Sequence, residues 1–184
     1  MKTFDQQAGP SRPSFSANQF EAVNRAVLLA EELVSNHYKM SSSQWLGPRY
    51  DVKTLKELEA GEVIEGPFAQ IIRYKGRRKN TSLGSASYDF YKICLQDHTI
   101  LETLGRRTDL PLFAFVLYII CHELIHIVRF GKFLQGFDAS EQERHAEEAL
   151  VHAETHQILQ PLRVDGLPEV LGFFENWRVA CDEF

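Results

Sequence analysis

The spacing of apolar residues divides the chain into segments of helical and of extended periodicity. Apolar residues recur every three or four positions from residue 18 and predict an amphipathic helix to about residue 38: Phe20, Val23, Val27, Ala30 and Val34. A short second helix is predicted over residues 52–60, because Asp51 can cap its start and Gly61 can end it. Residues 1–16 are rich in Gly, Pro and Ser, which predicts a flexible N-terminal tail.

An alternating pattern follows between residues 67 and 101. Ile72 and Tyr74 share one face of a strand, and a second strand is predicted from the shared face of Tyr91, Ile93 and Leu95. The connecting residues 76–84 hold turn formers and three adjacent cations, which suit the solvated tip of a hairpin. The pattern therefore predicts an antiparallel β-hairpin.

Three further helices are predicted in the second half of the chain. A central helix begins after Asp109, with Pro111 in its first turn, and ends near Gly131. Ser140 and Glu143 form a capping box, which predicts a helix from there to about residue 159. A last helix over residues 168 to about 180 is expected to close the core. Together these elements predict an α+β fold, mostly helical, in a single domain over residues 17–184.

Charge and composition narrow the classes of function. The formal charge of -5 and the pI near 5.8 do not provide the basic surface that nucleic-acid binding needs, so no nucleic-acid partner is expected. The three cysteines have no regular spacing and the N-terminus has no apolar signal segment, which together favour a cytoplasmic location. The longest apolar run, Leu110 to Cys121, is shorter than the roughly 20 residues that span a bilayer. We therefore expect no membrane segment and interpret this run as part of a buried helix.

Three polar residues interrupt the apolar central helix. His122 and His126 lie four positions apart, so a helix directs both imidazoles to the same point in space. Zinc prefers such nitrogen ligands, and a catalytic zinc site keeps one of its four positions for water. Glu123 follows the first histidine and can act as a general base toward that water. The pattern predicts a zinc site with His122 and His126 as ligands and Glu123 as the catalytic residue.

The segment His122-Glu123-Leu124-Ile125-His126 resembles the zinc motif of the HExxH metallopeptidases, the zincins. The resemblance covers at most residues 109–160. Residues 127–132 do not have the glycine and the third histidine at the positions of the metzincin form, which leaves a similarity to the gluzincins. It implies a mostly helical zincin-like domain, a small antiparallel sheet packed beside the motif helix, and an edge strand that binds extended peptide. In gluzincins a glutamate from a following helix supplies the third zinc ligand.

Several residues of the helix after the motif can supply that third ligand. Glu143 already takes part in the capping box, which leaves Glu147, Glu148, His145 and His152. His145, Glu148 and His152 share one stripe of this helix with His156, whereas Glu147 points to the side of Leu150 and Glu154. We therefore predict Glu148 as the third ligand. His152 and Glu147 are the alternatives, and His152 can also support a ligand from the second shell.

The oxyanion-stabilising residue has no clear signal in the sequence. Arg144, His145 and Tyr91 are the candidates.

The sequence thus predicts a zinc-dependent metallopeptidase that hydrolyses peptide bonds in a peptide or protein substrate. One alternative is a non-catalytic domain that binds a metal ion for stability and uses its surface to hold a partner. Another treats Glu123 and His126 as half of a carboxylate-bridged di-iron helical bundle, although such a bundle needs a second Glu-x-x-His pair and the chain has none.

Overall fold

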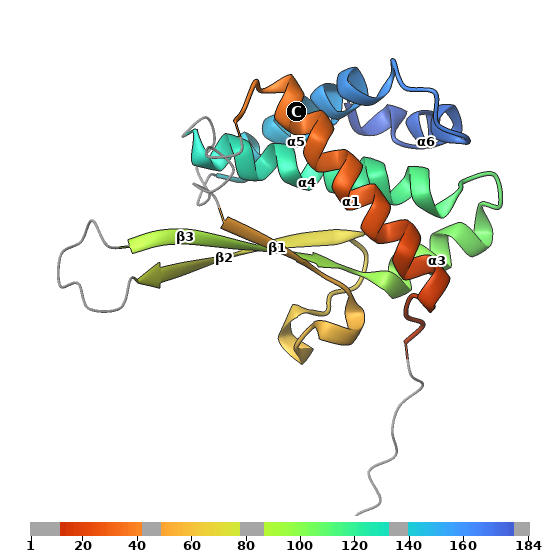
Figure 1. The fold of residues 1–184 in the computed structure, drawn as a ribbon, viewed down its shortest axis with the longest axis horizontal. Coiled ribbons are helices and arrows are strands. Elements are labelled where there is room, and N and C mark those ends of the chain that lie inside the picture. The colour runs from red at the N-terminus through yellow and green to blue at the C-terminus, as the bar shows by residue number, and fades with distance from the viewer. Residues whose placement is uncertain (1–11, 42–48, 78–86, 133–139, 179–184) are drawn as a thin grey trace, which may run out of the picture.

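The computed structural model describes residues 12–41, 49–77, 87–132 and 140–178. Its helices and strands follow in the order α1 (Ala17–His37), β1 (Arg49–Lys53), β2 (Ala69–Arg77), β3 (Ser87–Leu95), α3 (Asp97–Arg106), α4 (Leu112–Gly131), α5 (Glu141–Leu159) and α6 (Leu167–Phe173). Helices α1 and α4 lie over one face of a small three-stranded sheet (Figure 1). The predicted α+β, mostly helical fold class is confirmed.

Helix α1 begins and ends where the apolar spacing predicted. Ser16 caps it by accepting from the amide of Gln19, whose side chain in turn accepts from the Ser16 amide. The buried positions include Ala26 and Ala30, which allow close packing on α4, while Phe20 is 49% exposed. Residues 12–16 do not form the loose tail predicted for them: Phe15 is buried, and its amide donates to the Asp97 carboxylate. Residues 1–11 lie outside the described residues.

The predicted hairpin is present as β2 and β3, which pair in antiparallel register with Ile71 opposite Ile93. Its expected tip lies outside the described residues. The sheet is mixed, because β1 adds to the other side of β3 in parallel, with Val52 opposite Ile93. The helix predicted over residues 52–60 was therefore wrong. Val52 completes a strand, and the following residues form two 3₁₀ turns, Leu55–Glu57 and Ala60–Glu62.

Polar side chains at the end of β3 hold these turns in place. Asp97 accepts from the amide of Leu55 as well as from that of Phe15. Gln96 accepts from the amide of Ile64 and donates to the carbonyls of Glu62 and Cys94. Because these partners come from distant parts of the chain, no local pattern could predict the turns.

Two further helices differ from the prediction. Helix α3, which directly follows β3, was missed, because its first residues make tertiary hydrogen bonds and no side chain caps its start. The helix predicted over residues 168–180 is shorter than expected: α6 ends at Phe173, and a 3₁₀ turn follows over Glu175–Arg178. Residues 179 and 180 lie outside the described residues.

Helix α4 forms the centre of the hydrophobic core. Its apolar side chains contact residues of α1, β3, α5 and α6 in one continuous cluster. It is the one described helix that is long and apolar enough to cross a membrane, but 83% of that window is buried inside the protein. The apolar surface of α4 is thus used for internal packing, which is consistent with a soluble protein.

Gly166 provides a test of how the start of α4 is held. Gly166 precedes α6 with a φ of 71°, and an added Cβ would lie 2.1 Å from Cγ of Pro111, the N-cap of α4. We predict that Gly166→Ala lowers the free energy of unfolding by about 2 kcal/mol or more, from the combined backbone strain and steric overlap. Urea denaturation followed by circular dichroism measures this.

The matched control is Gly105→Ala near the end of α3, where an added Cβ meets nothing within 4 Å. It should leave stability unchanged or raise it by up to about 1 kcal/mol. Equal stability of Gly166→Ala and the wild type would contradict the close contact between Gly166 and Pro111.

Candidate metal centre

Helix α4 brings the two predicted histidine ligands together. His122 and His126 are one turn apart on its buried face and are 8% and 5% exposed. Their Nε2 atoms lie 3.1 Å from each other. Two imidazole nitrogens at this distance can share one proton in a hydrogen bond, or, with both nitrogens unprotonated, direct two lone pairs at one cation.

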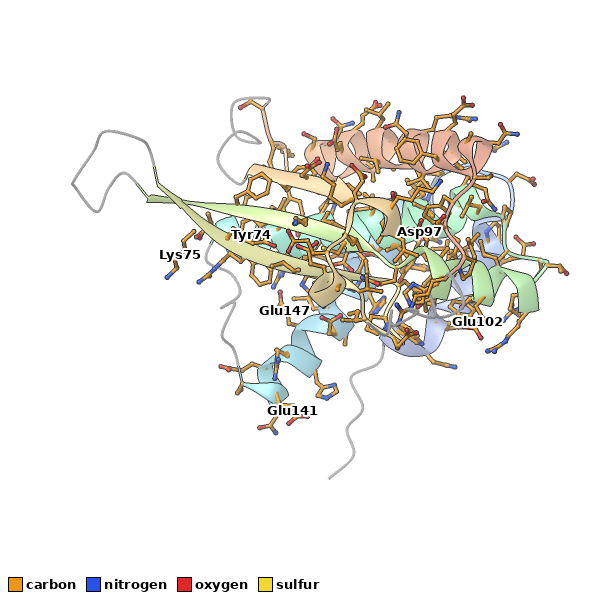
Figure 2. All side chains as sticks on the ribbon, turned by 90° about the horizontal axis from the view of Figure 1, so that it is seen from below. Tyr74, Lys75, Asp97, Glu102, Glu141 and Glu147 are labelled. Carbon is orange, nitrogen blue, oxygen red and sulfur yellow. The ribbon has the colours of Figure 1, made fainter. Side chains whose placement is uncertain are left out.

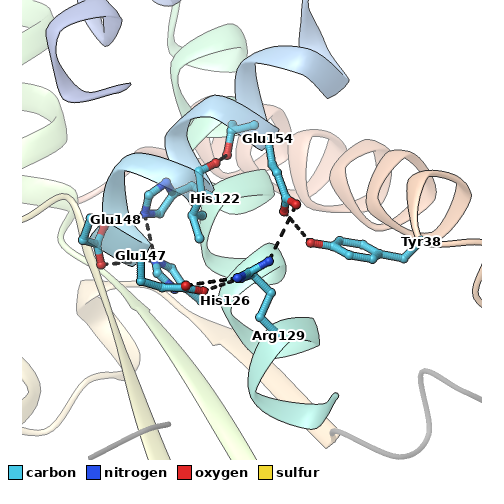
Figure 3. A network of polar contacts seen from close by, with 9 residues as sticks. Tyr38, His122, His126, Arg129, Glu147, Glu148 and Glu154 are labelled. Atoms are coloured by element: carbon cyan, nitrogen blue, oxygen red, sulfur yellow. Dashed lines mark hydrogen bonds and ion pairs between the residues drawn. The ribbon is translucent and has the colours of Figure 1, made fainter. Parts of the chain in front are cut away.

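Glu148 of α5, the residue predicted as the third ligand, lies beside both histidines. Its Oε2 lies 3.1 Å from Nε2 of His122, and its Oε1 lies 3.2 Å from Nε2 of His126 (Figure 3). Among the described residues, His122, His126 and Glu148 form a group of side chains that could hold a metal ion.

The distances within this trio suit zinc. Ligands at about 2.0–2.1 Å from a tetrahedral zinc ion lie about 3.3–3.4 Å from one another, close to the separations observed here. Burial opposes the ionisation of Glu148, but the hydrogen bonds and charges of the two histidines outweigh it and lower the pKa of this carboxyl. An ionised carboxylate beside two imidazoles is a donor set that a divalent cation prefers.

Glu123 lies in the wall of the same cleft as the three candidate ligands. Burial raises the pKa of its carboxyl, and the nearby histidines oppose that shift only in part. A carboxyl whose pKa is raised toward neutrality is better matched to proton transfer than an ordinary surface glutamate.

The two alternative ligands have other partners. Glu147 leaves α5 in a different direction from Glu148 and forms an ion pair with Arg129 of α4. His152 lines the cleft, and its Nδ1 lies 2.9 Å from the hydroxyl of Tyr118. The ring centroids of His152 and His122 are 4.2 Å apart, so His152 packs against a candidate ligand. This arrangement matches the supporting role that was the second possibility for His152.

Tyr118 and Trp177 are site residues that sequence reasoning missed. Tyr118 lies four residues before His122, on the same stripe of α4 as both histidines, and this spacing was the available signal. Trp177 was expected to close the core, as Phe174 does with 2% exposure, but Trp177 is 49% exposed and lines the cleft. No local sequence pattern distinguishes the buried Phe174 from the exposed Trp177.

The cleft has a volume of about 530 Å³ and lies between the sheet and helices α4 and α5. One wall is formed by residues 67–71, at the start of β2. Another wall is aromatic, with Tyr118, Phe174 and Trp177 beside His152. The candidate metal centre therefore opens into a space large enough for part of an extended chain with a bulky side chain.

The three candidates for the oxyanion-stabilising role lie in different surroundings. Arg144 lines the cleft from the first part of α5. Tyr91 is 2% exposed and stacks on Phe130. His145 is exposed, and it is not among the residues that line the cleft. Of these three, Arg144 is the residue with access to a molecule bound in the cleft.

Comparisons of the chain with protein-family models, with curated proteins and with solved structures gave no match.

Replacement of Glu148 tests the metal centre. We predict that the wild-type protein binds zinc and that Glu148→Gln weakens binding by about 100-fold or more, since even supporting partners of ligands change affinity by about 10–100-fold. Competition with a chromophoric chelator measures the affinity. The control is Glu141→Gln, an exposed change on the same helix that should leave zinc binding unaltered. Equal affinities of Glu148→Gln and the wild type would remove Glu148 from the ligand set.

Proposed function

We propose that this protein is a zinc-dependent metallopeptidase that hydrolyses peptide bonds, with His122, His126 and Glu148 as the zinc ligands. The observation that carries the proposal is the convergence of these three side chains in a cleft that also contains Glu123. The two Nε2 atoms lie 3.1 Å apart, and each lies 3.1–3.2 Å from one oxygen of Glu148. A structural zinc site has no need of an unbound carboxylate beside it, whereas a hydrolytic site requires a general base.

A zinc ion held by three protein ligands lowers the pKa of a bound water toward neutrality and polarises the carbonyl group of a substrate. The two imidazoles and the carboxylate would give the centre a net charge of +1. The cleft that these three residues line also contains Glu123.

Glu123 is the proton carrier in this proposal. Its carboxylate takes a proton from the attacking water as the new bond to the carbonyl carbon forms. It then gives the same proton to the amine as the peptide carbon–nitrogen bond breaks. Burial raises the pKa of this carboxyl above its ordinary value, which makes the carboxylate a stronger base than that of an exposed glutamate.

The start of β2 is the proposed binding site for the substrate backbone. Within the described sheet, β2 is an edge strand, and its first residues line the cleft together with Pro67 and Phe68. An extended peptide can add to such an edge through main-chain hydrogen bonds. Arg144, across the cleft, supplies positive charge for the carbonyl oxygen as it becomes negative.

The proposed substrates are peptides or proteins in the cytoplasm. Cys94 and Cys121 are buried free thiols, which accord with a reducing compartment.

The test is the substitution Glu123→Gln, assayed with a library of quenched fluorescent peptides. We predict that the wild-type protein cleaves some of these peptides and that Glu123→Gln reduces the rate by at least about 100-fold, because general-base catalysis contributes about 10²–10⁴-fold. The variant should keep the wild-type zinc content and melting temperature, since glutamine preserves the size of the side chain. Chelator treatment should abolish activity, and added zinc should restore it.

The control Glu141→Gln should retain full activity, because Glu141 is exposed on the outer part of α5. Peptide cleavage that survives in Glu123→Gln would overturn the role of this residue. Stoichiometric zinc without cleavage of any peptide would instead favour a non-catalytic metal-binding domain.

A further inference from the structure

The first two turns of α5 make little contact with the rest of the described protein. Residues 141–146 are all exposed, and Figure 2 shows the end of the helix that carries Glu141 projecting from the body of the molecule. Glu147 is the first position of α5 that is partly buried, and Ala149 is the first that is fully buried. The candidate ligand Glu148 thus lies at the point where α5 meets α4.

Glu148 is poorly held by its own packing. Its side chain is 51% exposed, in contrast to 12% for the side chain of its neighbour Glu147. A half-exposed glutamate has several rotamers available, and a helix end without packing tends to fray. Another interaction is needed to fix this part of α5 against α4.

The ion pair between Glu147 and Arg129 provides such an interaction. The Nε and Nη2 atoms of Arg129 donate to the two carboxylate oxygens of Glu147, the second over 3.0 Å, in a bidentate geometry (Figure 3). Arg129 is 9% exposed and lies three residues after His126, on the same helix as both histidines. A bidentate pair with little access to water restricts both position and orientation.

The pair controls the rotation of α5 about its own axis. Adjacent helical residues diverge by about 100°, so Glu147 and Glu148 leave α5 in two different directions. Both directions reach α4: Glu147 contacts Arg129, and Glu148 contacts the two histidines. If Glu147 is fixed on one side, the rotation that brings Glu148 to the histidines is fixed as well.

Arg129 also approaches a second carboxylate of α5, that of Glu154. Nη1 of Arg129 lies 3.7 Å from Glu154, which accepts a 2.5 Å hydrogen bond from the hydroxyl of Tyr38 in α1. Glu154 lies nearly two turns beyond Glu147 on α5. This contact stabilises the packing of α5 but lies far from the projecting part of the helix, so its loss serves as a control.

We propose that Arg129 and Glu147 are positioning residues that hold Glu148 at the metal centre by clamping the exposed start of α5 to α4. The inference rests on the proposed zinc site. It goes beyond that site because it makes the affinity for zinc depend on two residues, Arg129 and Glu147, that are not ligands and do not contact the substrate.

The test measures zinc affinity by chelator competition at a temperature where every variant is folded. Glu147→Gln should weaken zinc binding by about tenfold or more, as expected for a residue that orients a ligand. Arg129→Lys should lose less affinity than Arg129→Met, because lysine keeps one charged contact but not the bidentate geometry. Hydrogen exchange should show faster exchange of the amides of residues 147–150 in Glu147→Gln without bound metal.

Tyr38→Phe is the control, because it removes the hydrogen bond to Glu154 and the polar contact of Tyr38 with Arg129 but leaves both hydrogen bonds between Arg129 and Glu147 in place. It should lower the melting temperature and keep the wild-type zinc affinity. The double variant Arg129→Met/Glu147→Leu removes both charges of the pair, and Glu154 keeps its hydrogen bond from Tyr38, so it should be more stable than Arg129→Met alone. Its zinc affinity should stay low, because an apolar contact does not fix the rotation of the helix.

Two results would overturn the inference. One is an unchanged zinc affinity in Glu147→Gln, and the other is a loss in Tyr38→Phe as large as that in Glu147→Gln. Either result leaves the proposed function intact, provided that the wild-type protein binds zinc. A wild-type protein without zinc affinity would instead refute the metal centre itself.

Discussion

The burial of two imidazoles in the most apolar helix is the constraint on which the site depends. His122 and His126 are nearly inaccessible to water, and burial of polar groups is costly unless they have partners. The chain meets this requirement at the two Nε2 atoms with a carboxylate from another helix, since both oxygens of Glu148 face them, whereas Nδ1 of His122 is buried without a hydrogen-bond partner. The same requirement makes the arrangement suitable for a cation, because three ligand atoms already converge on one point.

The interface between α4 and the first half of α5 is polar, whereas Val151, Ile158 and Leu159 of its second half join the hydrophobic core. Helix α5 has few apolar residues in its first half, so hydrophobic contact alone does not orient it there. Ion pairs replace that contact: Arg129 binds Glu147 beside the candidate centre and approaches Glu154 farther along. Such pairs are directional, so they define the rotation of a helix more narrowly than apolar packing does. The proposed metal site and the packing of α5 are therefore parts of one interaction.

The cleft combines elements that are far apart in the chain. The start of β2 forms one wall, and the aromatic residues Phe174 and Trp177 of the C-terminal segment form another. In the described sheet β1 pairs with β3, so β2 lies at the other edge, and the start of β2 lines the cleft. An edge strand next to a candidate catalytic centre gives the proposed peptidase a backbone-binding surface and, on the opposite side, a pocket for a side chain.

The sequence by itself determined the features that depend on neighbours along the chain. The four-residue spacing of His122 and His126 and the capping box at Ser140 are local, and both lie in the expected helices. The stripe on α5 also singled out Glu148. Tertiary structure decided that Glu148 faces the histidines while Glu147 meets Arg129, because the rotation of one helix against another depends on contacts between distant residues. It likewise decided that residues 49–53 form a strand and that Trp177 lines the cleft, since sheet pairing and burial are properties of the whole fold.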